Sequence, residues 1–409
     1  MGWLKIYCRV FQFILNWGAK FLPWQKAVPV EGAGAILKIP ELLRSCRVQK
    51  VMVVLDAGLL KAGIGRRVTE ILDQEGLPYV QFSGVEANPT VGIVEAVREL
   101  YLREGCGGIL ALGGGSVMDA AKAAGARVVR PRRSLQQMAG LFKVGKKLPP
   151  LIAVPTTSGT GSETTIAALV TDPATHHKYA IMDLRLIPRY AVLDPDLVEG
   201  LPPGITAATG MDALTHAVEA YLCRSYNTPE SIRDALDAVG LIFENLERAY
   251  RNGRDREARQ AMMLASYKAG FAFTRSGVGN VHAIAHTLGG LYNTPHGLAN
   301  AVILPAVLED YGRGVYKKLA RLAEVSRTAP EGASEEGKAR AFIAAIYALN
   351  ERMGIPRRFD FIREEDIPQM SRWAFRESNP LYPVPVIYNE ARFRRVIESL
   401  RTGRQKRAE

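Results

Sequence analysis

The sequence predicts a doubly wound α/β domain of the Rossmann-like type, followed by an all-helical domain. Between residues 28 and 202, short apolar runs alternate with helical segments, which is the pattern of parallel βαβ units. Two of these runs end in loops rich in glycine or hydroxyl side chains. After residue 203, strand-like runs nearly vanish and helical periodicity takes over. The expected domains are therefore residues 28–202 and 203–409, preceded by an extension over residues 1–27.

The extension predicts one aromatic-rich amphipathic helix. Its polar residues recur at i, i+4, i+7, i+11 and i+15 and form a narrow stripe on an otherwise apolar cylinder: Lys5, Arg9, Gln12, Asn16 and Lys20. Three charges argue against a transmembrane span, and the lack of a small-residue cleavage site argues against a signal peptide. Two interpretations stay open. The helix packs on the protein or on a sister subunit, or residues 3–22 make a peripheral membrane contact in the lipid headgroup layer.

The composition is that of a globular protein, with 47% hydrophobic and 23% charged residues among 409. The net charge of +12 is mostly dispersed, and no basic stripe is interleaved with aromatic residues. We therefore expect no nucleic-acid partner. The four cysteines share no short spacing, which argues against a C-x-x-C motif and a disulfide framework, so a cytoplasmic location is expected.

Four apolar runs predict the buried strands of the α/β domain, and each ends in a turn. They are "VMVVLD" (51–56), "YVQF" (79–82), "GILALGGG" (108–115) and "PLIAVPTTSGTGSE" (150–163). Two later runs, "YAIMD" (179–183) and "YAVLDP" (190–195), predict further strands.

The third run leads into the glycine-rich turn "GGGSVMD" at residues 113–119 and then into a helix. Glycines permit close backbone approach, and a helix N-terminus offers unpaired N–H groups, so the turn suits a pyrophosphate. It is not the usual dinucleotide fingerprint, because Met118 stands where the third glycine belongs. By itself such a turn is also typical of an ordinary strand–helix connection.

A second polar loop, "PTTSGTGSETT" (155–165), supports the cofactor interpretation because its hydroxyls and amides can bond phosphate, ribose or amide groups. Both loops follow strands and would meet at the carboxyl edge of one sheet, where nucleotides bind in open α/β folds. Asp56 closes the first strand, where a carboxylate bonds a ribose 2′-hydroxyl and repels a 2′-phosphate. NAD is thus favoured over NADP. The alternative role for Asp56 is a helix cap.

Acidic and imidazole side chains recur at helical spacing in the second half of the chain. Asp212 and His216 lie four residues apart in one apolar helix, and His282 and His286 repeat that spacing in another. His296 follows "NTP" at the start of a third helix. An aspartate and three histidines from different helices suit a divalent cation and leave room for a substrate oxygen.

Together, "GGGSVMD", "PTTSGTGSE", "GMDALTHAVEAY" and "HAIAHTLGGLYNTPHGLANAVILP" resemble the iron-containing (group III) alcohol dehydrogenase family. The resemblance runs from about residue 28 into the C-terminal region. It implies the dehydroquinate synthase-like architecture, NAD(P) on the Rossmann-like domain, Fe²⁺ or alternatively Zn²⁺ on the helical domain, and an active site between them. It also implies a homodimer or larger homo-oligomer.

The resemblance assigns roles to individual residues. The metal ligands would be Asp212, His216, His282 and His296, and His286 would be a catalytic histidine that does not bind the metal. The cofactor would be held by residues matching the family's nucleotide contacts: Asp56, Asn88, Gly114, Gly115, Ser116, Asp119, Thr156, Thr157, Thr160 and Lys178.

The chain departs from the family pattern at Ala87, at Thr287 after the second histidine of its helix, and in the segment "NPLYPVPV". These departures leave the choice of alcohol or aldehyde open. The expected chemistry is metal-dependent hydride transfer between a small alcohol or aldehyde and nicotinamide C4. Three alternatives remain: a dehydroquinate-synthase-like lyase, a metal-free reductase similar to maleylacetate reductase, and a membrane- or nucleic-acid-associated binding protein with a degenerate enzyme fold.

Overall fold

A computed structural model describes residues 2–173 and 177–402. The chain forms two compact units. An α/β unit comprises residues 23–201 and 254–270, and a helical unit comprises residues 1–22, 202–253 and 271–409. We describe each unit by itself.

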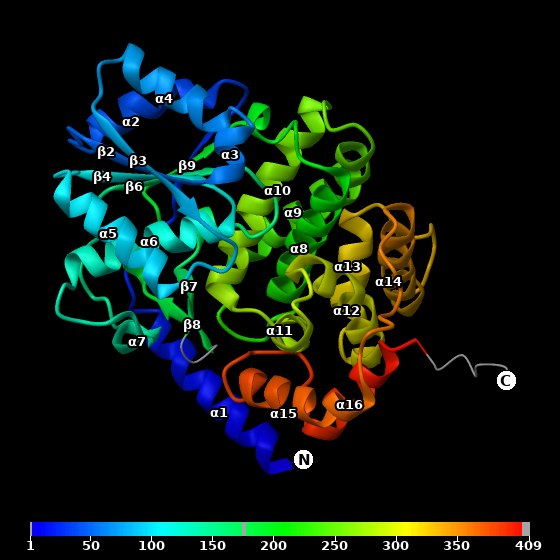
Figure 1. The fold of residues 1–409 in the computed structure, drawn as a ribbon. Coiled ribbons are helices and arrows are strands. Elements are labelled where there is room, and N and C mark those ends of the chain that lie inside the picture. The colour runs from blue at the N-terminus through cyan, green and yellow to red at the C-terminus, as the bar shows by residue number, and fades with distance from the viewer. Residues whose placement is uncertain (1, 174–176, 403–409) are drawn as a thin grey trace, which may run out of the picture. The chain divides into compact units, whose positions relative to one another are not determined.

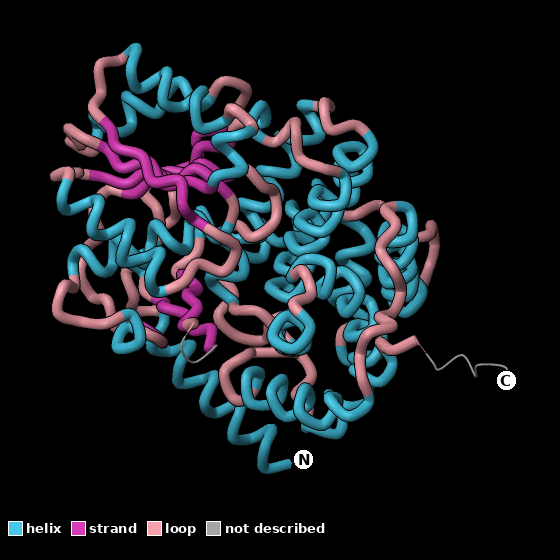
Figure 2. The backbone as a smooth tube through the Cα atoms, viewed as in Figure 1, coloured by secondary structure: helices cyan, strands magenta, loops and turns pink. Residues whose placement is uncertain are grey.

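A six-stranded sheet in the order β1-β9-β6-β4-β2-β3 forms the centre of the α/β unit, and all five pairings are parallel. The strands, magenta in Figure 2, are β1 (Val28–Glu31), β2 (Val51–Asp56), β3 (Tyr79–Val85), β4 (Gly108–Gly113), β6 (Leu151–Pro155) and β9 (Tyr190–Leu193). β2, β4 and β6 are almost wholly buried, as their continuous apolar sequences predict. Their carboxyl ends lie side by side at one edge.

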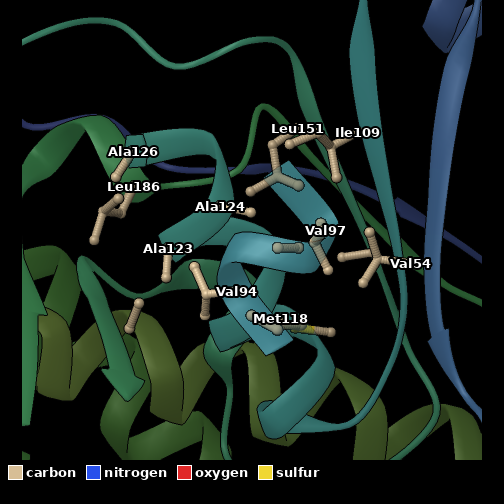
Figure 3. Close-up of a cluster of buried hydrophobic side chains, with 14 of the residues drawn as sticks. Val54, Val94, Val97, Ile109, Met118, Ala123, Ala124, Ala126, Leu151 and Leu186 are labelled. Atoms are coloured by element: carbon tan, nitrogen blue, oxygen red, sulfur yellow. The ribbon is translucent and has the colours of Figure 1, made fainter. Parts of the chain in front are cut away.

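Helices cover both faces of this sheet (Figure 1). On one face α5 and α6 pack against β2 and β4, as the apolar cluster around Val54, Val97 and Ile109 shows (Figure 3). On the other face α2 and α4 pack through Leu43, Val68 and their neighbours. The helices of this unit are α2 (Ile39–Ser45), α3 (Ala57–Lys61), α4 (Ile64–Gln74), α5 (Val91–Arg103), α6 (Gly115–Val129) and α7 (Leu135–Met138).

A smaller sheet in the order β5-β8-β7 completes the α/β unit. Its strands are β5 (Gly140–Leu141), β7 (Ala167–Asp172) and β8 (His177–Met182), and β8 covers residues 179–182 of the run expected at 179–183. Segment 254–270 joins this unit because Met263 and Tyr267 pack with Ala27 and Ala191. A Cβ added at Gly161 would lie 2.5 Å from Cα of Gly270, so this contact needs glycine on both sides.

The helical unit carries the second half of the chain. Its helices are α1 (Gly2–Ala19), α8 (Pro203–Leu222), α9 (Pro229–Arg251), the end of α10 (Arg256–Ser276), α11 (Asn280–Tyr292), α12 (His296–Tyr311), α13 (Tyr316–Val325), α14 (Glu335–Arg352), α15 (Ile367–Ser378) and α16 (Glu390–Ser399). α8 is buried on almost every side, which explains its apolar, alanine-rich sequence. α9 begins at a capping box between Thr228 and Ser231, with Pro229 at its first position.

Short 3-10 helices occur at 35–38, 162–164, 184–186, 195–197, 312–314 and 364–366. Within the described ranges, no helix has the length and apolarity needed to cross a bilayer.

Candidate metal centre and cofactor loops

The four predicted ligand residues meet in the helical unit. Asp212 and His216 lie one turn apart on α8, His282 is in the first turn of α11, and His296 is the first residue of α12. One ligand atom from each lies within 4.8 Å of the corresponding atoms of the others. Three helices therefore bring together one carboxylate and three imidazoles.

This set suits a divalent cation of the first transition row. Imidazole nitrogen and carboxylate oxygen bind Fe²⁺ and Zn²⁺ well, and four protein ligands leave further coordination positions open. Asp212, His216 and His282 are buried, whereas the side chain of His296 is 41% exposed. Burial and the three neighbouring histidines hold the pKa of His282 well below its ordinary value, so its ring is neutral, as a ligand must be.

A buried carboxylate orients His282. Glu219 Oε2 lies 2.6 Å from His282 Nδ1, and the backbone N–H groups of Gly279 and Val281 donate to Glu219 at 2.8 Å each. When Nδ1 carries the proton and donates to Glu219, Nε2 presents its lone pair to the ligand cluster. Burial raises the pKa of Glu219 to about 8, against the opposing effect of the backbone donors.

Asn300 lies among three of the ligand atoms. Its Nδ2 is 2.7 Å from Asp212 Oδ1, 3.2 Å from His282 Nε2 and 3.1 Å from His296 Nε2. Asn300 reaches them because it follows His296 by one turn of α12. With two hydrogens, the amide donates to two of these three acceptors at a time. Asn300 therefore holds the cluster together by donating hydrogen bonds to the same lone pairs that would bind a cation.

The predicted catalytic histidine, His286, lies beside the cluster with a different partner. Its ring stacks on that of His296 at 5.3 Å, and its Nδ1 lies 2.6 Å from Glu377 Oε1. The same carboxylate oxygen accepts a hydrogen bond from the hydroxyl of Tyr382 at 2.7 Å. The side chains of His286 and Glu377 are partly exposed, at 41% and 31%. His286 thus lies outside the group of four residues, and its Nδ1 is held by Glu377.

In the α/β unit, the two polar loops face each other across their glycines. A Cβ at Gly114 would lie 3.4 Å from Thr157, and one at Gly115 would lie 3.0 Å from Thr160. A side chain at Gly115 would therefore crowd the opposite loop, whereas one at Gly114 would make an ordinary van der Waals contact with it. Gly114 immediately precedes α6, so the unpaired N–H groups of that helix open at the same place.

Further polar groups join these loops. The backbone N–H of Asn88, which has a φ of 56°, donates to Ser116 Oγ at 3.3 Å, so the loop after β3 meets the glycine turn. Ser162 Oγ donates to Asp119 Oδ1 at 3.3 Å. Thr156 is buried at the end of β6. The strand ends thus collect most of the candidate cofactor residues.

Lys122, one turn after Asp119 on α6, is fully buried beneath the second loop. Its Nζ lies within hydrogen-bond distance of oxygens of Ser162, Thr165 and Ala167, at 2.6 to 3.2 Å. Burial lowers its pKa to about 8. The lysine ties the second loop to the helix that begins at the glycine turn.

Asp56 does cap a helix, which was the alternative role that the sequence left open. Its Oδ1 accepts from the N–H of Leu59 at 2.9 Å, at the start of α3. A carboxylate has a second oxygen and further lone pairs, so capping does not use up its capacity for a ribose hydroxyl. The side chain of Lys178 lies outside the described part of the chain.

Sequence reasoning missed four residues of these two sites. The sequence contains a local indication of Glu219, because this residue follows His216 by three positions on the same helix face. Lys122 follows Asp119 at the same spacing. Asn300 shares a helix with His296 at a spacing of four. Glu377 had none, because it is 91 residues from His286 in the chain.

Comparisons with known proteins agree with this architecture. The chain matches the sequence family "Iron-containing alcohol dehydrogenase" over residues 29–195 and "Fe-containing alcohol dehydrogenase family, C-terminal" over residues 206–399. It is 39% identical over 352 residues to 1,3-propanediol dehydrogenase of Klebsiella pneumoniae, covering 85% of this chain and 90% of that protein. It is 36% identical over 351 residues to lactaldehyde reductase of Escherichia coli K12, covering 84% and 90%.

Solved structures give the same result. The crystal structure of a 1,3-propanediol oxidoreductase has a TM-score of 0.88 at 36% identity and covers 93% of this chain and all of that one. Sulfoacetaldehyde reductase from Bifidobacterium kashiwanohense, in complex with NAD⁺, has a TM-score of 0.82 at 28% identity, with 93% and 99% covered.

The fold, the cation-binding set and these relatives define a class of enzyme, the oxidoreductases that interconvert alcohols and carbonyl compounds. Within that class, the chain belongs to the iron-containing alcohol dehydrogenase family. The lyase and binding-protein alternatives find no support among the relatives.

Proposed function

We propose that this enzyme transfers hydride between NAD(H) and a small alcohol or aldehyde at a site built on a divalent cation. The observation that carries the proposal is the cluster formed by the buried Asp212, His216 and His282 with the partly exposed His296. Iron is the preferred ion because the family is named for it, and Zn²⁺ is the alternative because the donor set accepts both.

The cofactor is proposed to bind where the loops after β2, β3, β4 and β6 converge. The N–H groups at the start of α6 suit the pyrophosphate. Hydroxyl groups of the second loop suit the ribose and amide groups of the cofactor. The carboxylate of Asp56 favours NAD over NADP because it would repel a 2′-phosphate. The proposed contacts are Asp56, Asn88, Gly114, Gly115, Ser116, Asp119, Thr156, Thr157, Thr160 and Lys178.

When bound, the cation supplies Lewis acidity toward the substrate oxygen and the nicotinamide accepts or donates hydride. The protein's own residues prepare this step. Glu219 fixes the orientation of His282, and Asp212, His216, His282 and His296 would hold the cation in one place. His286 exchanges the hydroxyl proton with solvent, because its ring lies beside His296 and its other nitrogen is hydrogen-bonded to the partly exposed Glu377.

Relatives named for lactaldehyde and 1,3-propanediol support a small, polar alcohol or aldehyde as the substrate. The segment around Tyr382, which departs from the family pattern and reaches Glu377, is the part of the helical unit that we expect to tune this choice. Assembly into a homodimer or larger homo-oligomer, and a cytoplasmic location, stay predictions. Light scattering after size exclusion measures the first.

The test follows NADH absorbance at 340 nm with metal-stripped protein and lactaldehyde or 3-hydroxypropanal, under anaerobic conditions. Fe²⁺ is added in one arm, Zn²⁺ in another, and NADPH replaces NADH in a third. We expect turnover that depends on the cation and is fastest with Fe²⁺ and NADH. The control is Asp212→Ala, which should lose both the bound cation and the activity. If wild-type protein with bound cation oxidises NADH with neither these substrates nor a wider panel of aldehydes and ketones, the proposal is wrong.

A further inference from the structure

α1 meets the helical unit through the middle of its polar stripe, together with the side chains of Leu4 and Cys8. Arg9 donates to the carbonyl oxygens of Val384 and Pro385 at 2.8 and 3.2 Å. Gln12, which is buried, donates to the carbonyl oxygens of Pro380 and Tyr382 at 2.9 and 2.8 Å. Interactions with four backbone carbonyls fix the rotation of the helix about its own axis.

Other contacts on the same side fix the helix further. The side chain of Cys8 is fully buried against Val384 and Ile387. Asn16 Oδ1 accepts from the backbone N–H of Tyr226 at 3.2 Å. The inward side of α1 is therefore packed and hydrogen-bonded along most of its length, so the opposite side is held outward.

The outward side is a row of large apolar side chains, which we call the aromatic face. Its members recur every three or four residues and are all more than half exposed: Trp3, Ile6, Tyr7, Val10, Phe13, Ile14, Trp17 and Phe21. Trp3 is 86% exposed, and Phe21, in the turn after α1, is 72% exposed. An apolar surface this continuous is typical of an interaction site.

The charge around this face selects the partner. Residues 1–30 contain Lys5, Arg9, Lys20 and Lys26 and no acidic residue. Lys5 and Lys20 are exposed near the two ends of the helix. If two copies of the face met, only cations would be brought together, without acidic partners from either helix. An anionic lipid surface supplies the missing negative charge.

The side-chain types agree with a lipid surface. Tryptophan and tyrosine favour the headgroup region of a bilayer, and long basic side chains extend from it to water. α1 is too polar to cross a bilayer, but a helix lying in the plane buries only one side. The family match begins at residue 29, after this helix, so the face is an addition to the shared catalytic body.

We propose that α1 binds the surface of an anionic lipid bilayer in the plane of the headgroups, with its aromatic face inserted. The enzyme is then a peripheral membrane protein, held by one helix whose inner side is fastened to the helical unit. This inference uses none of the catalytic residues, so it stands or falls apart from the proposed function.

The test is co-sedimentation of the full chain with vesicles of phosphatidylcholine and phosphatidylglycerol, compared with phosphatidylcholine alone. We expect strong binding to the mixed vesicles, weaker binding to the neutral ones, and partial loss at high salt. Replacing Trp3, Phe13, Trp17 and Phe21 together by serine should reduce binding at least about tenfold. The matched control, Leu37→Ser with Leu102→Ser, removes exposed apolar side chains elsewhere and should change nothing.

Two further measurements separate the outcomes. Fluorescence of Trp3 and Trp17 should shift to the blue and be quenched by brominated lipid when vesicles are present. The four-serine variant should keep the thermal midpoint and NADH turnover of the wild type, so weaker binding cannot be ascribed to unfolding. The proposal is overturned if wild-type protein does not bind the mixed vesicles or if the variant binds equally. It is also overturned if light scattering shows that the variant merely loses a self-association that lipid does not affect.

Discussion

Glu219→Gln tests whether the residue behind His282 controls the metal centre. The substitution keeps the size of the side chain but leaves one acceptor oxygen where there were two. In one orientation the new amide group faces the N–H of Val281, and that buried donor loses its partner. In the other orientation the new amide group faces the N–H of Gly279 and Nδ1 of His282. Nδ1 must then accept a hydrogen bond, so the histidine carries its proton on Nε2, the nitrogen that faces the ligand cluster.

The second orientation places a proton on the nitrogen that a cation needs, and the first leaves His282 with a neutral amide oxygen, a weaker acceptor than a carboxylate, so both weaken cation binding. Loss of a carboxylate that orients a metal-bound histidine typically costs about 10- to 100-fold in affinity, or about 1.4 to 2.7 kcal/mol. The unpartnered N–H adds about 1–3 kcal/mol of lost folding stability. We expect a 10- to 100-fold weaker Fe²⁺ or Zn²⁺ affinity in competition with a chelator, and a lower thermal midpoint.

The control for this prediction is Glu309→Gln, which makes the same replacement at an exposed position on α12. It should leave cation affinity unchanged. Wild-type affinity in Glu219→Gln would refute the reasoning, because it would mean that the orientation of His282 does not depend on the carboxylate.

His286→Ala should slow turnover by about 10- to 100-fold while the protein keeps its cation. Steady-state kinetics measure the first effect and metal analysis the second. Loss of the cation would instead mean that His286 is a ligand. Lys122→Met leaves several buried oxygens without their donor and should raise the KM for NADH about tenfold and lower the thermal midpoint. Unchanged values of both would rule out a role in holding the second loop. Asp310→Asn should lower the free energy of unfolding at neutral pH by about 1–2 kcal/mol. Burial acts to raise the pKa of Asp310, but the nearby Tyr388 hydroxyl and hydrogen bonds from Arg392 and Arg395 outweigh it and hold that pKa below 3.8. The stability is therefore fully present above pH 3.8 and disappears as the pH falls through the folded-state pKa, so urea titrations of wild type and variant should converge in acid.

The strands and the ligand spacing could be predicted from the sequence because their signals are local. β2, β4 and β6 are buried on both faces, and such strands appear as continuous apolar runs. Asp212 and His216 share one face of α8 because their spacing of four matches the helical repeat.

Features that depend on distant pairing could not be predicted in this way. Nothing near His286 indicates Glu377, because the bond between them depends on how α15 packs beside α11. The periodicity of residues 3–22 gives an amphipathic helix but does not say which side meets the protein. In α1 the polar side packs inward because backbone carbonyls of segment 380–385 need donors, which apolar side chains cannot supply.

The fastening of α1 to segment 380–385 also has a consequence for how this enzyme is produced. That segment includes Tyr382, whose hydroxyl bonds the carboxylate next to His286. A chain started at residue 23 for easier handling would lose the donors to four backbone carbonyls at this place. Kinetic constants should therefore be measured on protein that includes α1, because those of a chain without this helix describe a catalyst with one support removed.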